Sequence, residues 1–200
     1  MKRKICSRCR RPATVCYCHT IKSVTNAWPV QILQHPAESN HAIGTARIAQ
    51  LSLSRCRLQV GEHFDRTSVA SGLAEELEPI LVYPDESATP VEELDPQQPR
   101  MLLFLDASWR KSRRMLHESS YLRSLPKISL QPRRASHYRI RKVPGQYALS
   151  TLEAIVSVLS ILEGKDNQYQ PLLDSMDWMI EKQIELMGRE VFQRNYKDKG

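Results

Sequence analysis

The run Met-Leu-Leu-Phe-Leu at residues 101–105 is the feature that most constrains the fold of this chain. Five consecutive apolar residues are typical of a strand buried on both faces, as in the middle of a parallel sheet covered by helices. The run ends at Asp106, so a carboxylate directly follows the expected strand. With 200 residues, of which 41% are hydrophobic, the chain can bury such a core.

Shorter strands and helices alternate around this run. Expected strands cover residues 30–33, 58–60, 79–84 and 127–130. Expected helices run from a cap at Ser39 or Asn40 to residue 51, from 108 to about 122, from a cap at Ser150 or Thr151 over 152–162 to a stop at Gly164, and from about 171 to 192. Residues 85–100 are expected to be a surface loop, 131–147 a basic loop or extended segment, and Cys56 a buried thiol in a helical pattern. The alternation predicts an α/β domain with a mostly parallel sheet.

Four of the five cysteines fall within a short basic segment, as Cys6, Cys9, Cys16 and Cys18. Two close pairs of thiolates suit tetrahedral Zn²⁺. The alternatives are two disulfides, which require an oxidising compartment, or a loose or redox-active cluster. His19 follows the last cysteine and is a substitute ligand in this interpretation. We expect residues 1–24 to form a zinc-binding segment.

Two function classes are disfavoured by the apolar pattern. No apolar run approaches the ~18 residues that a membrane span requires. The basic start of the chain is not followed by the apolar stretch of a secretory signal. We therefore expect a cytoplasmic protein without a membrane partner.

The charge is unevenly distributed along the chain. The formal net charge is +7. Residues 1–22 hold seven Lys and Arg and no acid, residues 107–152 hold eleven against Glu118 alone, and residues 71–99 hold eight acids and no base. The pattern is compatible with ordinary solvated surface, but it also fits a basic face for RNA or DNA.

Ligands of a parallel sheet bind at the carboxyl ends of its strands. That rule selects residues 35–45, Tyr83 with Pro84, and Asp106 to Trp109. Neither G-x-G-x-x-G nor a P-loop occurs, so the common nucleotide cradles are not expected. Asp106 can serve as a proton acceptor or as a helix cap, and Trp109 can stack on a base or lie in the core.

Together these segments resemble a known family. Cys-x2-Cys at 6–9, Gln-His-Pro-Ala-Glu at 34–38, Gly-Thr-Ala-Arg at 44–47, Leu-Asp-Ala-Ser-Trp at 105–109 and Leu-Ser-Thr-Leu-Glu-Ala at 149–154 occur in the order of the DTW-domain proteins. The resemblance covers roughly residues 5–190. The family's name motif has Thr before Trp, whereas this chain has Ser108. Because the hydroxyl is retained, we expect function to be kept.

The resemblance implies a tRNA-uridine aminocarboxypropyltransferase related to the knotted SPOUT enzymes, with residues 25–200 as the catalytic domain. Such an enzyme transfers the 3-amino-3-carboxypropyl group of S-adenosylmethionine to N3 of a uridine in tRNA and releases 5′-methylthioadenosine. Asp106 is the expected base or positioning group, flanked by Ser108 and Trp109, and Arg47 is the expected partner of the donor's carboxylate. The other expected donor-binding residues are His35, Pro36, Thr45, Leu81, Tyr83, Leu105, Tyr147, Ser150, Thr151 and Glu153.

The tRNA is expected to lie on the second basic block. Its expected contacts are Arg110, Lys111, Arg113, Arg114, Arg133, Arg134, Tyr138, Arg139, Arg141 and Lys142. The cysteine segment is expected to be a second RNA contact or a structural staple. Two other functions remain open at this point: a SPOUT-type RNA methyltransferase, and a non-catalytic zinc-stapled RNA-binding protein.

Overall fold

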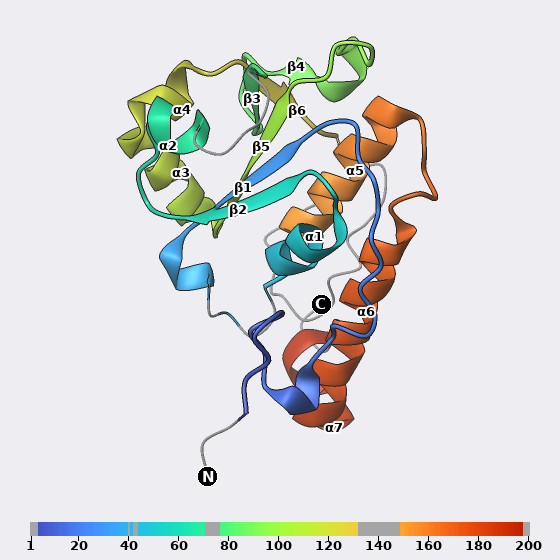
Figure 1. Cartoon of the computed structure of the whole chain (residues 1–200). Helices are drawn as coiled ribbons and strands as arrows, with labels where there is room; N and C mark the ends of the chain where they lie inside the picture. Colours follow the sequence, from blue (N-terminus) through green and yellow to red (C-terminus); the bar gives the residue numbers. More distant parts are fainter. Residues whose placement is uncertain (1–3, 40, 42–43, 71–76, 132–148, 198–200) are drawn as a thin grey trace.

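Six strands form one sheet in which every pair of neighbours is parallel (Figure 1). The structure is a computed structural model that describes residues 4–39, 41, 44–70, 77–131 and 149–197. The sheet order is β2-β1-β5-β3-β6-β4. In chain order the strands are β1 Val30–Gln34, β2 Cys56–Val60, β3 Pro79–Val82, β4 Thr89–Pro90, β5 Met101–Asp106 and β6 Lys127–Ser129. The predicted α/β class with a parallel sheet is confirmed.

Strand β5 lies between β1 and β3, as its apolar sequence predicts. Successive side chains of a strand point to opposite faces of the sheet. Accordingly Leu102 belongs to one hydrophobic cluster and Leu103 to another, and both are fully buried. The strand extends to Asp106, which stands in register with Gln34 at the end of β1.

Helices cover both faces of the sheet, which explains why β5 is apolar throughout. On one side lie α1 Ala46–Ser52, α5 Thr151–Glu163 and α6 Gln170–Met187, and on the other lie α2 Arg66–Ala70, α3 Trp109–Glu118 and α4 Ser120–Ser124 (Figure 1). The first cluster contains Ile155 and Leu172, and the second contains Met115 and Leu122. In the described part of the chain, no helix combines the length and the hydropathy of a membrane span.

Helix α5 begins and ends at the residues that the sequence suggests. The Ser150 hydroxyl oxygen accepts a hydrogen bond from the Glu153 N–H, and the Glu153 carboxylate accepts one from the Ser150 N–H. This capping box satisfies two donors that a helix start leaves unpaired. Gly164, at φ 62°, ends the helix in the left-handed conformation that favours glycine.

The first predicted helix starts later than expected. A 3-10 turn, Pro36–Glu38, follows β1, and its cap is the His35 ring nitrogen, which accepts from the Ala37 N–H. Helix α1 begins only at Ala46, and the Thr45 side chain makes no capping bond. Pro36 stands at the first position of this turn, where its missing N–H costs nothing. Asn40 lies outside the described residues.

Two other predicted helices are each interrupted. The span 108–122 is divided at Ser119, whose buried hydroxyl oxygen accepts a hydrogen bond from the Phe64 N–H at 3.0 Å. The last helix breaks at Gly188, with φ 86°, into α6 and α7 Arg189–Phe192. The first break coincides with a buried polar contact to a distant part of the chain, and the second with the conformational freedom of glycine.

Three smaller expectations need correction. Cys56 begins β2 and is not in a helix, so β2 is longer than predicted. The expected surface loop 85–100 contains β4 and a 3-10 turn, Val91–Glu93, whose Val91 is fully buried. The basic segment 131–147 lies outside the described residues except for residue 131. The knot implied by the family resemblance stays a prediction, because residues 132–148 are outside the described part.

The cysteine segment packs against α6 near the C-terminal end of the described chain (Figure 1). Its 3-10 turn is Ala13–Val15, and Tyr17 is fully buried in the cluster that also contains α6. The Ser175 hydroxyl on α6 donates to the Thr20 carbonyl at 3.0 Å. The division of the chain at residue 24 remains a prediction.

Candidate active site at the carboxyl edge of the sheet

Asp106, at the end of β5, is the centre of the site because side chains from β1 and from α5 bond to its carboxylate. The Thr151 hydroxyl at the start of α5 donates to Oδ1 at 2.6 Å, and the Gln34 amide at the end of β1 donates to Oδ2 at 2.7 Å. Asp106 is 9% exposed. Two donors from separate segments hold this carboxylate in one orientation at the edge of the sheet where ligands of parallel sheets bind.

Gln34 is a site residue that the sequence analysis missed. It lies in the quoted segment 34–38, but its position as the last residue of a strand gave it no predicted role. A polar side chain that is fully packed at a strand end needs a partner, and the Asp106 carboxylate is that partner. The sequence does contain a signal for this role, because glutamine is the only polar residue type in the otherwise apolar run of residues 30–34.

Trp109 and Tyr83 form an aromatic pair beside Asp106. Their ring centroids are 6.2 Å apart and the rings are nearly edge-to-face, at 67°. Trp109 is 48% exposed, so the alternative of a core tryptophan is wrong. Ser108 precedes α3 at its cap position, but its side chain makes no capping bond. The pair therefore offers an exposed aromatic surface at the ends of β3 and β5.

The other predicted donor-binding residues fall into different environments. Leu81 is fully buried in the core, Thr45 is buried, and Ser150 and Glu153 are engaged in the capping box. His35 donates its backbone N–H to the Asp106 carbonyl at 3.1 Å, and its Nε2 lies 3.4 Å from the Glu62 carboxylate. Pro36 and Leu105 lie at the same edge of the sheet, on the turn after β1 and within β5. Tyr147 lies outside the described residues.

A hollow adjoins Gln34, the hydrogen-bond partner of Asp106, on the β1 and β2 side of the sheet edge. It comprises about 420 Å³ including its open side. The lining residues come from the cysteine segment, from the strand ends and from α1: Cys9, Arg10, Arg11, Gln34, Glu38, Ser39, Gly44, Arg47, Leu58 and Val60. Burial, together with the nearby positive charge of Arg10, lowers the pKa of Arg47. Arg47, a predicted donor-binding residue, thus lies beside two arginines to which the sequence analysis gave no such role.

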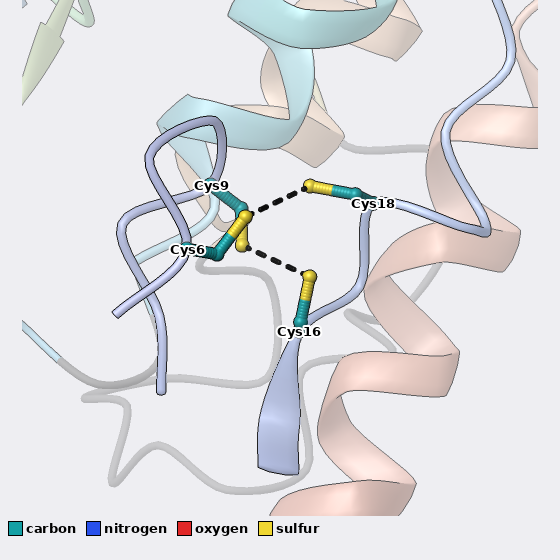
Figure 2. A group of neighbouring side chains, drawn as sticks. All are labelled: Cys6, Cys9, Cys16 and Cys18. Carbon is teal, nitrogen blue, oxygen red and sulfur yellow. Dashed lines mark hydrogen bonds between the residues drawn. The ribbon is translucent and has the colours of Figure 1, made fainter. Parts of the chain in front are cut away.

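The four clustered cysteines are arranged as a metal site (Figure 2). The Cys6 and Cys18 sulfurs are 3.7 Å apart, the Cys9 and Cys16 sulfurs 3.6 Å, and all four lie within 4.8 Å of one another. Sulfurs that surround zinc tetrahedrally at about 2.3 Å are about 3.8 Å apart. The donor set therefore fits a tetrahedral ion of the zinc type. All four are free cysteines, and their separations exceed the roughly 2.05 Å of a disulfide.

The surroundings of the thiols distinguish Cys6 from its neighbours. Hydrogen bonds from the backbone of Cys9 and Arg8 lower the pKa of Cys6 to about 6, whereas burial raises the pKa of Cys9, and that of Cys18 to about 12. His19 is not part of the group; its ring lies edge-on to Trp178, with centroids 4.6 Å apart.

Only part of the predicted RNA-binding surface is described. Arg110, Arg113 and Arg114 are exposed on α3, and Lys111 is half-buried. The Arg114 guanidinium donates to the Glu118 carboxylate at 2.7 Å, and the Lys111 ammonium donates to Glu38 at 3.0 Å. The remaining predicted contacts lie outside the described residues: Arg133, Arg134, Tyr138, Arg139, Arg141 and Lys142.

Fold and site together define a ligand-binding α/β domain with its polar site at the carboxyl ends of the central parallel strands. Comparison with family models identifies the particular family. The DTW domain model matches residues 3–184, so the chain belongs to the DTW domain family. The match includes both the cysteine segment and the Asp106 edge.

Curated relatives agree with this membership. The chain is 30% identical over 192 residues to a Drosophila melanogaster protein named tRNA-uridine aminocarboxypropyltransferase 2, with 92% of this chain and 76% of the relative covered. A Macaca fascicularis protein of the same name is 32% identical over 184 residues, covering 86% of this chain and 60% of the relative. An Arabidopsis thaliana tRNA-uridine aminocarboxypropyltransferase A is 26% identical over 140 residues, covering 59% and 52%. This chain thus spans from about half to three quarters of the length of these relatives.

Proposed function

We propose that this chain transfers the 3-amino-3-carboxypropyl group of S-adenosylmethionine to N3 of a uridine in tRNA and releases 5′-methylthioadenosine. The observation that carries the proposal is the Asp106 carboxylate, held by Gln34 and Thr151 at the ligand-binding edge of a DTW-family domain. The names of the curated relatives support the aminocarboxypropyl group and a uridine of tRNA as its acceptor, whereas the donor, the N3 position and the released product rest on the family resemblance. A module that only binds RNA would have no need of such a constrained carboxylate.

The reaction requires one proton acceptor and one defined approach. A C–N bond forms between uridine N3 and the γ-carbon of the donor while the C–S bond breaks, and the electron pair remains on the sulfur of methylthioadenosine. The donor supplies a sulfonium leaving group. The protein must direct N3 to the γ-carbon instead of the methyl carbon, which is a matter of orientation.

Asp106 accepts the N3 proton in this proposal. Hydrogen bonds from Gln34 and Thr151 hold the carboxylate in one orientation, so in this proposal it accepts from the imide N–H without turning. The exposed Trp109 ring, supported edge-on by Tyr83, offers a surface on which the target base stacks. Ser108, which makes no capping bond, is available to the substrate between these two residues.

The donor lies along the carboxyl edge. Arg47 binds the carboxylate of the donor. Backbone and polar groups at the segment ends surround the rest of the donor: His35, Pro36, Thr45, Tyr83, Leu105 and Thr151. The Leu81 side chain is in the core and its N–H donates to the Pro126 carbonyl at 3.0 Å, so in this proposal Leu81 supports the strand and does not contact the donor. Ser150 and Glu153 act by fixing the start of α5, which places the Thr151 hydroxyl on Asp106.

The remaining groups have supporting roles. We propose that Cys6, Cys9, Cys16 and Cys18 hold Zn²⁺, which ties the cysteine segment into one compact turn. The basic residues Arg110, Arg113 and Arg114 at the start of α3 contact tRNA phosphates and set its register. Arg and Lys contacts of this kind give affinity without reading the base sequence.

The test is incubation of the protein with tRNA and S-adenosylmethionine, followed by mass spectrometry of nucleosides and of the small-molecule product. The expected result is uridine carrying an aminocarboxypropyl group, together with methylthioadenosine. Formation of S-adenosylhomocysteine and methylated RNA would instead identify a methyltransferase. Binding of tRNA without binding of the donor would identify a non-catalytic RNA-binding protein.

A further inference from the structure

The hollow beside Gln34 carries charges of both signs on segments that are far apart in the sequence. Arg10 and Arg11 come from the cysteine segment, Arg47 from α1, and Glu38 from the turn after β1. The Arg11 side chain donates to the Gly44 carbonyl at 3.4 Å, so the cysteine segment is fastened to the entrance of α1. Positive groups thus line one part of the hollow, with a carboxylate in the same wall.

Arg10 is held in an unusual backbone conformation. Its φ is 58°, the one positive value among the non-glycine residues that the structure describes. Two hydrogen bonds within the cysteine turn impose it: the Arg10 N–H donates to the Cys6 carbonyl at 2.9 Å, and the Cys6 N–H donates to the Arg11 carbonyl at 2.8 Å. Glycine would adopt this conformation at lower cost, so the arginine side chain is retained at a position that disfavours it.

Gln34 connects the hollow to the proposed reaction centre. It lines the hollow and also donates its amide hydrogen to Asp106 at 2.7 Å. A group in the hollow is therefore separated from the carboxylate by a single side chain. That short separation suits the part of the donor that carries the reacting γ-carbon.

We infer that this hollow binds the amino-acid end of the donor, with its carboxylate between Arg10 and Arg47 and its ammonium facing Glu38. The inference rests on the proposed function and deepens it, because it makes the cysteine segment a wall of the donor site. The group held in the hollow is the one that is transferred. Arg10 and Glu38 are then specificity-determining residues that position the γ-carbon.

The mixed charge of the hollow favours an amino acid over an RNA phosphate. A phosphate can pair only with the arginines, whereas an amino acid can also place its ammonium beside the Glu38 carboxylate, which it then shares with Lys111. Glu38 is placed by its ion pair with Lys111 at 3.0 Å. A carboxylate and an ammonium on one carbon fit the two signs of charge that the wall presents.

The test compares two neutral thioethers, S-adenosylhomocysteine and 5′-methylthioadenosine, by calorimetry on the zinc-loaded protein. Both contain the adenosine, and they differ in whether the sulfur carries the aminocarboxypropyl group or a methyl group. Their affinity ratio therefore isolates binding of the amino-acid end. The variants are Arg10→Gly, which permits the positive φ, and Glu38→Gln. Arg8→Ala is the matched control, because it removes the same charge from the same turn and Arg8 does not line the hollow.

Wild-type protein is expected to prefer S-adenosylhomocysteine, and both variants are expected to reduce that preference about tenfold, as befits loss of a charge-assisted contact. Arg8→Ala is expected to leave the ratio unchanged. Equal wild-type affinities, or an unchanged ratio in Arg10→Gly, would overturn the inference. If that variant instead weakened tRNA binding with a smaller salt dependence, the hollow would be a phosphate site. If the wild-type protein catalyses the transfer but the variants keep its affinity ratio, the hollow is not the donor site and the proposed function still stands. If the wild-type protein neither binds the donor nor catalyses the transfer, both proposals are rejected.

Discussion

The cysteine segment and the Asp106 edge line the same hollow, but they are held in place by different physics. The cysteine segment converges on four thiols that lie within 4.8 Å of one another, and a cation can hold them together. The Asp106 edge is held by a parallel sheet with a hydrophobic cluster on each face. In our proposal one wall of the site therefore depends on a removable ion, whereas the other depends on buried area.

Because of this difference, the order of the cysteine segment and the stability of the sheet can be lost separately. Removal of the metal should disorder one wall while the sheet stays folded, and a change in the core should destabilise the sheet while the thiols can still bind metal. The segment does have some packing of its own, because Cys9 and Tyr17 are buried and Thr20 is bonded to Ser175 on α6. The predictions that follow test how far the two walls are independent.

The largest effect is expected for Cys9→Ser, which removes one of the four metal ligands. Structural zinc in small domains contributes about 10 kcal/mol of apparent binding free energy, and an incomplete ligand set loses most of it. We expect zinc content to fall below one per chain and amide exchange to accelerate in residues 4–24. Exchange in β5 should change little. Mass spectrometry of the native protein and hydrogen exchange measure both.

The control for this change is Cys56→Ala, because Cys56 lies in β2 and outside the metal group. Burial raises the pKa of the Cys56 thiol to about 12, so it stays protonated and is a poor metal ligand. Its variant should keep full zinc content. If amide exchange in residues 4–24 were the same with and without metal, the order of the cysteine segment would not depend on the ion.

Asp106→Asn tests the wall that the sheet supports. General-base catalysis contributes about 10²–10⁴-fold to a rate, so we expect kcat to fall in that range while zinc content and melting temperature change little. Transfer to tRNA is followed by nucleoside mass spectrometry. The matched control is Asp85→Asn, which alters an exposed aspartate in the loop after β3. Undiminished turnover in Asp106→Asn would exclude this residue as the proton acceptor.

Leu103→Ala removes a fully buried side chain from the centre of β5. A large-to-small change in a core costs about 2–5 kcal/mol of the free energy of unfolding, through lost burial and the cavity left behind. Chemical denaturation measures this cost. Zinc binding by the folded protein should be unaffected. Leu186→Ala, at a position that is 61% exposed, should stay within about 0.5 kcal/mol of the wild type.

Ser150→Ala is expected to have the smallest effect. It removes the hydroxyl that accepts from the Glu153 N–H, a capping contact that contributes about 1 kcal/mol. Because the cap fixes the start of α5, we also expect a modest loss of kcat through a displaced Thr151. Ser157→Ala, within the same helix, serves as the control. A fall in zinc content in Ser150→Ala would show that the two walls are coupled through α5.

Sequence patterns predicted the elements whose determinants are local. The apolar run of β5, the capping box at Ser150 and the stop at Gly164 are encoded in a few neighbouring residues, and all three are confirmed. The prediction failed where a distant contact decides. The break at Ser119 depends on a bond to Phe64, which is fifty-five residues away in the chain.

The candidate site was predicted in part for the same reason. Asp106 and Thr151 follow from strand and helix ends, and the cysteine group follows from its spacing. The partnership of Gln34 with Asp106 did not follow, because it requires β1 and β5 to be neighbours in register. Arg10 was also missed as a lining residue, since nothing in a linear pattern indicates that the cysteine turn lies beside α1.

The sequence by itself therefore determined the fold class, the group of four cysteines, the carboxylate at the strand end and the family, because each is carried by short segments with local physical consequences. Only the tertiary structure decided which side chains share a site. Parallel strands bring together residues that are far apart in the chain, so the strand order sets the pairing of Asp106 with Gln34 and Thr151. The packing of the cysteine segment then places Arg10 and Arg11 beside Arg47.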